Sequence, residues 1–317
     1  MSRYDYILID SMNLLHRAAH TYTLGFMNDE GDWIQTGPVF GFLSMSIAIW
    51  EKYAAPGCQL IFCWDAGYDH RLKIYPEYKA NRRKKKAENQ ELEPEERTNL
   101  PSMQSALRKI LYVAGFRQAI SPGYEADDVL GTLGAQLDGK GKVGLYTWDQ
   151  DLHQCVTDSV HVLSENRGVM KVWTPVEVEG KWGFPPNRVA EIKGLIGDGG
   201  DNIPGVPGCG LKWAQKLFHR YGDIRRIIAA TGVGPKPVLK GEFQGKKWKT
   251  PSLTTKIAAA GDQIYMSWEL AKVVKDAPVI MEHPEPDIKV FRQVLDSLRF
   301  NSLLEGRKWS SLEAIRG

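Results

Sequence analysis

Carboxylates are crowded at one point of this sequence. The stretch "YEADDVL" (124–130) places Glu125, Asp127 and Asp128 within four positions, beside apolar residues spaced as on an amphipathic helix. Glu125 and Asp128, three residues apart, would share a helix face, with Asp127 roughly 100° away from Asp128 around the axis. Like charges at such spacing repel, and each favours the uncharged form of its neighbour. The crowding therefore predicts a positive charge that compensates it.

Further acids follow apolar runs that are expected to be strands. The runs and their acids are 4–10 with Asp10, 58–65 with Asp65, and 142–151 with Asp149 and Asp151. Two more, Asp198 and Asp201, follow an expected helix in a glycine-rich turn. Taken singly, each acid is more simply interpreted as a helix cap or a solvated turn residue. Because ligands collect at the carboxyl ends of parallel strands, however, the strand-end acids are expected to share one rim.

Nine acids from five chain segments would destabilise a fold or take up protons if no cation were present. Oxygen donors without cysteine or histidine point to Mg²⁺ or Mn²⁺, and this number suffices for two ions. Two such ions, about 4 Å apart, can activate a water, clamp a phosphate and stabilise the leaving oxygen. The acids therefore predict hydrolysis of phosphodiester bonds.

A basic segment follows the second of these strands. Residues 70–86, "HRLKIYPEYKANRRKKK", interleave lysines and arginines with Tyr75 and Tyr78. This composition suits phosphate contacts combined with base stacking. The alternative is a solvated charged helix or linker. The length of the excursion and its place beside the acidic rim favour a function.

A glycine-rich turn is a second candidate for phosphate binding. "GDNIPGVPGCGLKWAQKL" joins two expected helices through Gly205, Gly208 and Gly210, and Lys212 opens the second helix. Glycines let the backbone approach a phosphate, and the free amides of a helix start attract anions. The alternative is an ordinary Gly/Pro helix connection. The glycine-rich turn comes shortly after Asp201, and this position favours phosphate binding over an ordinary connection.

The elements that would position these residues form an α/β domain followed by a helical one. Between the strands, helices are predicted at 38–54, 99–114 and 124–137, an alternation typical of a parallel or mostly parallel sheet. After a boundary near 175–186, helices continue at 187–196 and 211–220. The insert 231–252, rich in Gly, Pro and Lys, is expected to be a loop.

Composition narrows the class of protein. The 317 residues, 43% of them hydrophobic, suffice for one large domain or two smaller ones. The net charge of +3 does not by itself point to any particular partner. The separate basic and acidic clusters, however, suggest one site for negatively charged ligands and one for positively charged ligands. Four scattered cysteines predict a reduced, cytosolic protein. No apolar run approaches the roughly 20 residues that span a bilayer, and the short charged start predicts no secretory signal.

The chain resembles the 5′-nuclease (flap endonuclease) family, above all its phage and bacterial members and the 5′-nuclease domain of bacterial DNA polymerase I. The matching stretches are "LIDSMNLLHRA" (8–18), "FCWDAGYDHRLKIYPEYKANR" (62–82), "YEADDVLGTL" (124–133), "TWDQDLHQCV" (147–156) and "IGDGGDNIPGVPGCGLKWAQKL" (196–217). They occur in family order and span most of residues 1–220, and 267–279 resembles a late helix of the family.

The resemblance implies a PIN-like α/β fold, with a central, mostly parallel sheet flanked by helices, a helical arch and a C-terminal helix–three-turn–helix domain. It implies a metal-binding catalytic domain at 1–182, with the arch at 70–97. A helical DNA-binding domain would follow at 183–317, with the helix–three-turn–helix module at 187–220.

The resemblance also implies a role for each candidate residue. One metal ion would be surrounded by Asp65, Asp127, Asp128 and Asp149, and a second by Asp149, Asp151, Asp198 and Asp201. Asp10 and Glu125 match positions that act mostly through bound water. Lys79 and Arg82 match residues that neutralise the scissile phosphate, Tyr78 one that stacks on the substrate, and Arg17 another basic position. DNA contacts are implied for Gly205, Val206, Gly208, Gly210, Lys212, Arg83, Lys84 and Lys85.

The implied activity is a structure-specific 5′-3′ exonuclease or flap endonuclease of DNA replication and repair. It would use two Mg²⁺ ions, with Mn²⁺ as a substitute, and K⁺ at the glycine turn as in some members. Its substrate would be a 5′ flap, a nick or a 5′-ended duplex. The enzyme is expected to be a stand-alone monomer of a bacterial or phage-infected cytoplasm, without a membrane partner, and a single-strand-binding protein or clamp would fit as a further partner.

Two other functions stay open. One is removal of RNA primers from RNA–DNA hybrids by the same site. The other is a non-catalytic protein that binds DNA junctions, against which the presence of every carboxylate argues. The stretch "TWDQD" departs from the family, because Trp148 and Gln150 stand where Gly and Lys are frequent.

Overall fold

The computed structural model describes residues 3–84, 100–166, 169–232, 242–243, 246–247 and 256–316. The chain divides into two compact units: unit 1 comprises Met1–Tyr68, Thr98–Thr174 and Val274–Gly317, and unit 2 comprises Asp69–Arg97 and Pro175–Val273. This division differs from the two consecutive domains that the sequence predicts. The C-terminal segment returns to the sheet of unit 1, where β11 (Ile280–Glu282) pairs with β5 (Gln118–Ile120).

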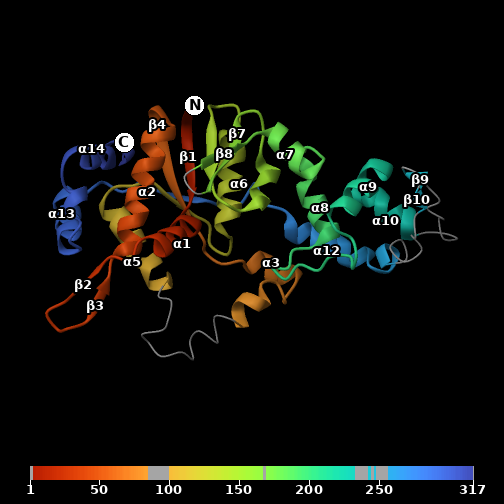
Figure 1. Ribbon diagram of the computed structural model, residues 1–317, viewed down its shortest axis with the longest axis horizontal. Coiled ribbons are helices and arrows are strands. Elements are labelled where there is room, and N and C mark those ends of the chain that lie inside the picture. Colours follow the sequence, from red (N-terminus) through yellow and green to blue (C-terminus); the bar gives the residue numbers. More distant parts are fainter. Residues whose placement is uncertain are drawn as a thin grey trace. The chain divides into compact units, whose positions relative to one another are not determined.

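Unit 1 is built on a seven-stranded sheet with the order β11-β5-β4-β1-β6-β7-β8 (Figure 1). The other strands are β1 (Tyr4–Asp10), β4 (Ala54–Trp64), β6 (Val143–Tyr146), β7 (Val160–Asn166) and β8 (Val169–Trp173). The inner pairs from β5 to β7 are parallel, and the outer pairs β11–β5 and β7–β8 are antiparallel. The prediction of a mostly parallel central sheet is therefore confirmed.

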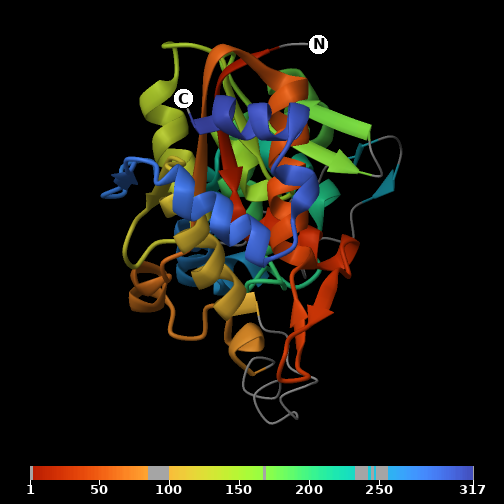
Figure 2. The ribbon, with the colours of Figure 1, turned by 90° about the vertical axis from the view of Figure 1, so that its left-hand side faces the viewer.

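Helices of unit 1 pack on this sheet and on one another. They are α1 (Ser11–Thr21), α2 (Gly37–Tyr53), α5 (Leu100–Val113), α6 (Ala126–Leu137), α13 (Ile288–Ser297) and α14 (Gly306–Arg316). The C-terminal helices, blue in Figure 2, belong to this core, because α13 packs on α5 and α14 on α2. Buried aromatic rings such as Phe42, Phe62, Phe116 and Phe291 fill the space between these helices and the strands. A hairpin of β2 (Gly25–Met27) and β3 (Trp33–Gln35) follows α1.

Unit 2 is mainly helical. Its helices are α3 (Asp69–Ile74), α7 (Pro175–Trp182), α8 (Val189–Ile196), α9 (Leu211–Tyr221), α10 (Ile224–Gly232) and α12 (Gly261–Ala271). α8 packs closely on α12, where a Cβ on Gly194 would stand 2.8 Å from that of Trp268. The buried Arg71 of α3 ties down the end of α12, since its guanidinium donates to the carbonyls of Leu270 (3.2 Å) and Lys272 (3.0 Å).

Some expectations fall on residues that the structure leaves out. In the insert 231–252, β9 (Glu242–Phe243) and β10 (Lys246–Lys247) form a short antiparallel ladder. The remainder of that insert after residue 232 lies outside the described residues, as does the part of the expected arch at 85–97. Within the described part of the chain, no helix combines the length and apolar character that a bilayer crossing requires.

Candidate metal centre and nucleic-acid contacts

The ends of adjacent parallel strands bring acids together at one edge of the sheet in unit 1. β1 lies between β4 and β6, and its last residue, Asp10, is in register with Cys63 near the end of β4. Asp65 directly follows β4, and Asp149 follows β6 after a short turn. These acids come from separate parts of the sequence, so the sheet topology alone places them on one rim.

Asp10 is buried, and its carboxylate accepts several hydrogen bonds. Its Oδ1 accepts from the backbone N–H of Asn13 (3.0 Å), which caps α1, and its Oδ2 accepts from the Asn13 amide and from the Thr147 hydroxyl (2.9 Å). Burial and the charge of Asp65 outweigh these donors and raise the pKa of Asp10 to about 7. The raised pKa thus shows that Asp10 is both buried and close enough to Asp65 for their charges to interact.

Asp127 shows the same crowding from the N-terminal turn of α6. Burial, followed by the charges of neighbouring acids, raises its pKa well above the ordinary value. The neighbours, in decreasing order of effect, are Asp149, Asp10, Glu125 and Asp65. Four chain segments thus contribute charge to one place.

Asp128, next in sequence, is placed quite differently. It is fully buried, its Oδ2 accepts from the backbone N–H of Glu125 (3.3 Å), and the Glu125 side chain accepts the backbone N–H of Asp128 in return. Oδ1 accepts from the backbone N–H of Val274 (2.9 Å). Both carboxylate oxygens of Asp128 therefore bind backbone donors and tie the start of α6 to a distant segment.

Asp149 immediately precedes a short 3₁₀ helix (Gln150–Cys155) and Asp151 lies on it, where the sequence predicts that the strand continues. Asp149 caps this helix, with its Oδ1 accepting from the backbone N–H of Asp151 (2.8 Å). The backbone N–H of Asp149 in turn donates to the Thr147 hydroxyl (3.0 Å). The strand itself ends at Tyr146, and the Thr147 hydroxyl, which also binds Asp10, connects the residues after the strand to the rim.

The rim suits a hard divalent cation. Its donors are carboxylate oxygens, and the pKa values of Asp10 and Asp127 are raised first by burial and then by the charges of neighbouring acids, both of which a bound cation would offset. Within the part of the chain that the structure describes, no three acidic, histidine or cysteine side chains already stand in metal-binding geometry. Binding an ion would therefore draw these carboxylates closer.

Unit 2 holds the other two predicted acids, and it compensates them internally. Asp198 follows α8, and its Oδ2 forms an ion pair with Lys193 of that helix (2.9 Å). Its Oδ1 accepts the backbone N–H groups of Gly200 (2.8 Å) and Asp201 (3.4 Å). Burial would raise the pKa of Asp198, but the Lys193 charge and these donors outweigh it, and the pKa is lowered.

Asp201 is surrounded by three residues of the predicted basic segment. Its Oδ1 pairs with the guanidinium of Arg82 at 2.6 Å. Its Oδ2 lies 3.6 Å from the Lys79 ammonium and accepts a hydrogen bond from the Tyr78 hydroxyl (3.1 Å). Lys79 has a left-handed backbone (φ 54°), and its N–H donates to the Asp201 carbonyl (2.9 Å). The predicted phosphate-binding residues are thus held in place by a carboxylate.

The glycine turn between α8 and α9 is tightly packed at one glycine and open at another. A Cβ on Gly205 would stand 2.1 Å from the Ile196 carbonyl oxygen, so only glycine fits there. Val206 is buried beside it and donates its N–H to the Leu195 carbonyl (2.8 Å). Gly208 has a φ of 88°, and Gly210 caps α9 with open space around its Cα. The turn therefore presents backbone rather than side chains before the helix.

The remaining predicted basic residues differ in environment. Lys84 and Lys212 are exposed, and Lys212 lies in the first turn of α9. The Arg83 guanidinium donates to the carbonyls of Tyr78 and Pro76 (2.8 Å for Pro76), so it braces the turn before Lys79. Lys85 lies outside the described residues.

Sequence reasoning missed the residues that support the acids. Lys193 neutralises Asp198, while Thr147 and Asn13 bind Asp10. Lys193 had a recognisable signal, since a lysine within an apolar helix that precedes an acidic turn is placed to pair with it. Thr147 had none, because its partner is 137 residues away in sequence.

Family models cover most of the chain. The model of the 5′-3′ exonuclease N-terminal resolvase-like domain matches residues 5–183, and that of the 5′-3′ exonuclease C-terminal SAM fold matches 184–293. The chain therefore belongs to the 5′-3′ exonuclease family.

Relatives and solved structures agree with this family. The chain is 35% identical over 283 residues to a 5′-3′ exonuclease of Bacillus subtilis, covering 87% of this chain and 88% of the relative. It is 31% identical over 317 residues to DNA polymerase I of the same organism, covering 97% of this chain. It spans 33% of that polymerase's length. A flap endonuclease of phage T5, solved with DNA and metal ions, shares the fold with a TM-score of 0.64 at 18% identity, covering 98% of this chain and 99% of the phage protein.

Proposed function

We propose that the protein is a divalent-metal-dependent 5′ nuclease that hydrolyses phosphodiester bonds near the 5′ ends of branched or nicked DNA. The observation that carries this proposal is the cluster of acids whose charges meet at Asp127, in a member of the 5′-3′ exonuclease family. A structurally similar phage protein has been solved with DNA and metal ions, which supports both the substrate class and the ions.

We assign the first metal ion to the rim of unit 1. Asp10, Asp65, Asp127 and Asp149 are the acids whose charges meet there, so they are the candidates to bind it directly or through water. Asp128 and Glu125 would act by positioning α6, because they hold one another and the Val274 N–H. A role of Asp151, Asp198 and Asp201 with a second ion rests on the sequence resemblance.

Divalent ions at such a site supply Lewis acidity, which lowers the pKa of an attacking water and stabilises charge on the phosphate oxygens. The sequence resemblance implies that cations of the chain add to this charge stabilisation. Lys79 and Arg82 present two positive charges at one carboxylate, and a phosphate offers them the same kind of oxygen acceptor. Tyr78 and Arg83 hold this pair in position. Arg17, the other predicted basic residue, would contribute from unit 1.

Duplex binding is assigned to the glycine turn and the exposed lysines. The backbone around Gly208 and Gly210 together with Lys212 would contact phosphates of the duplex without distinguishing bases. Lys84 and Lys85 would add phosphate contacts. Mg²⁺ as the working ion, K⁺ at the turn, a monomeric state and a cytoplasmic location are proposed on the sequence resemblance, as are a single-strand-binding protein or clamp as partner and RNA–DNA hybrids as further substrates.

The test uses a duplex with a labelled 5′ flap, incubated with Mg²⁺ or with EDTA. Wild-type protein should cleave near the flap junction only with Mg²⁺, and Asp127→Asn should reduce the rate by at least about a hundredfold because a metal-binding carboxylate is lost. Asp158→Asn, an exposed acid between β6 and β7, is the matched control and should cleave normally. The cleavage rate of a nicked RNA–DNA hybrid, measured in parallel, shows whether the protein also acts on this second class of substrate. Flap cleavage that persists in EDTA would refute the metal-dependent mechanism.

A further inference from the structure

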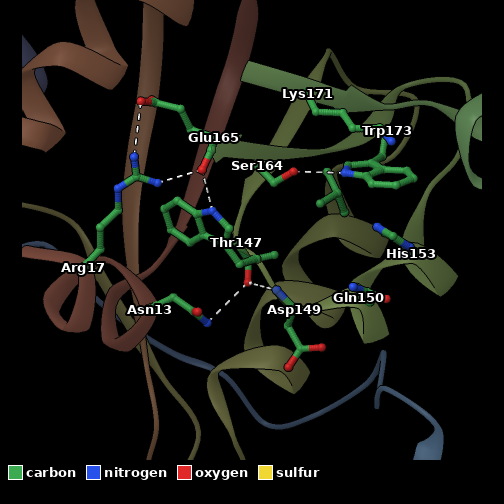
Figure 3. Close-up of a pocket in the computed structure, with 12 residues that line it drawn as sticks. Asn13, Arg17, Thr147, Asp149, Gln150, His153, Ser164, Glu165, Lys171 and Trp173 are labelled. Carbon is green, nitrogen blue, oxygen red and sulfur yellow. Dashed lines mark hydrogen bonds and ion pairs between the residues drawn. The ribbon is translucent and has the colours of Figure 1, made fainter. Parts of the chain in front are cut away.

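A cavity of about 780 Å³ adjoins the acidic rim of unit 1. Asn13, Thr147 and Asp149, which belong to the hydrogen-bond network of the rim, line one side of it. Figure 3 shows Arg17 and Asn13 facing His153, Lys171 and Trp173 across the space. Its volume lies within the roughly 300–1,000 Å³ that is usual for small-molecule sites.

Two indole rings, those of Trp148 and Trp173, are part of its wall. Trp148 is half-buried, and Trp173 is the last residue of β8. A cation lies over the face of each ring. The guanidinium of Arg17 lies 4.8 Å from the centre of the Trp148 ring, and the Lys171 ammonium 3.5 Å from that of Trp173.

The indole N–H groups have partners within the wall itself. The Trp148 Nε1 donates to the Glu165 carbonyl (2.7 Å), and the Trp173 Nε1 donates to the Ser164 hydroxyl (3.0 Å). The His153 imidazole also packs against the Trp173 ring, with ring centres 4.3 Å apart, so Trp148 is the ring whose carbon surface is the candidate for contact with an occupant. Rigid aromatic surface of this kind favours another planar ring by stacking.

The charges that line the cavity balance. Arg17 pairs with Glu165 (3.4 Å) and donates to its carbonyl (2.7 Å), while Lys171 and Asp149 contribute one charge of each sign. A phosphate would meet two carboxylates as well as two cations and thus no net positive charge, whereas a neutral ring would meet aromatic walls with amide and hydroxyl groups beside them. The cavity thus suits a nucleobase better than a phosphate.

We propose that this cavity is a nucleobase subsite, in which the base of a nucleotide adjoining the cleaved phosphodiester packs against Trp148. The proposal rests on the proposed nuclease function, because the shared residues Thr147 and Asp149 place the cavity beside the acids that would bind the scissile phosphate. Trp148 would then determine how firmly that nucleotide is held, independent of the base sequence.

The first experiment changes the substrate and keeps the wild-type protein. Flap substrates carry a single abasic site at successive positions on both sides of the cleavage point, and Kd is measured by fluorescence anisotropy in EDTA. Loss of the base at one adjoining position should weaken binding about five- to twentyfold, as for the loss of a stacked base, while distant positions change little. Uniform Kd values across all positions would overturn the proposal. Cleavage of the intact flap with Mg²⁺ tests the nuclease function separately.

Variants then assign the effect to the cavity. Trp148→Ala should bind the intact and the sensitive abasic substrate with equal Kd, and Trp148→Leu, which keeps apolar volume without a ring, should do the same. Trp33→Ala, on β3 and 58% exposed, is the matched control and should keep the discrimination. If Trp148→Leu still discriminates as wild type does, the base binds elsewhere and the proposal is wrong.

A competitor experiment distinguishes a base in DNA from a free nucleotide. Deoxyadenosine 5′-monophosphate should displace the flap substrate from wild-type protein at lower concentration than deoxyribose 5-phosphate does, and Trp148→Leu should remove this difference. Equal competition by the two compounds in wild-type protein would mean that only phosphate is recognised, which would overturn the subsite.

Discussion

Asp127 and Asp128 are neighbours in sequence, and the structure predicts opposite effects when each is changed to asparagine. Asp128→Asn leaves the side-chain oxygen free to accept from Val274 but turns an amide N–H toward the N–H of Glu125. This replaces a charge-assisted hydrogen bond with a neutral one and leaves a buried donor without an acceptor. The two losses together amount to about 2–3 kcal/mol of the free energy of unfolding. Asp127→Asn removes a charge that the fold already disfavours, so it should not destabilise the metal-free protein.

The assay is urea unfolding in EDTA, followed by tryptophan fluorescence, for wild type and both variants. The unfolding midpoint of Asp128→Asn should fall clearly, and that of Asp127→Asn should stay or rise. With Mg²⁺ present, wild type should gain stability by mass action, and Asp127→Asn should gain less because a binding oxygen is lost. Equal destabilisation by the two variants in EDTA would refute the distinction between a structural and a metal-binding acid.

Four further predictions concern the rim, the basic segment and the turn. Without metal, the free energy of unfolding should fall by up to about 4 kcal/mol as the pH rises from about 4 to 7, because the Asp10 carboxyl ionises at a lower pH in the unfolded chain than in the folded one. Denaturation curves at several pH values measure this fall, and Mg²⁺ should make it smaller. Lys79→Ala should lower kcat on a flap substrate at least tenfold and change Kd little; a pure loss of affinity would contradict its phosphate-neutralising role. Lys212→Ala should reduce the slope of log Kd against log salt by about one phosphate contact, and an unchanged slope would remove it from the DNA. Gly205→Ala should lower the thermal midpoint by several degrees, since its Cβ would clash with the Ile196 carbonyl; an unchanged midpoint would show that the turn can shift.

The sequence predicts those parts of the fold that carry a local signal. The runs at 4–10 and 58–65 are apolar because β1 and β4 are central strands buried on both faces, and the helices at 38–54, 99–114 and 124–137 match α2, α5 and α6. Short edge strands carry little such signal. β5 and β11 have three residues each, and β11 finds its partner across more than half of the chain.

The end of unit 2 shows the same limit at one helix. The stretch 267–279 resembles a late helix of the family, but α12 ends at Ala271. The segment from Val274 onward belongs to unit 1, where side chains of α6 bind its backbone: Asp128 accepts the N–H of Val274, and the Thr132 hydroxyl donates to the Val274 carbonyl (3.3 Å) and accepts the N–H of Ala277 (3.1 Å). A long-range hydrogen-bond network thus overrides local helix propensity, and no sequence window contains that network.

The two groups of acids differ in how their charge is compensated, and this difference supports the division of roles. In unit 2, Asp198 is paired with Lys193, and Asp201 lies against both Lys79 and Arg82, so each of these carboxylates has a cation of the chain as its partner. In unit 1, no such cation is paired with Asp127 among the described residues, and its pKa is raised. An acid cluster that a fold leaves uncompensated costs stability unless a cation arrives from solution. The rim of unit 1 is therefore where metal binding should contribute most to stability, whereas a phosphate or an ion that approached Asp201 would have to exchange existing ion pairs.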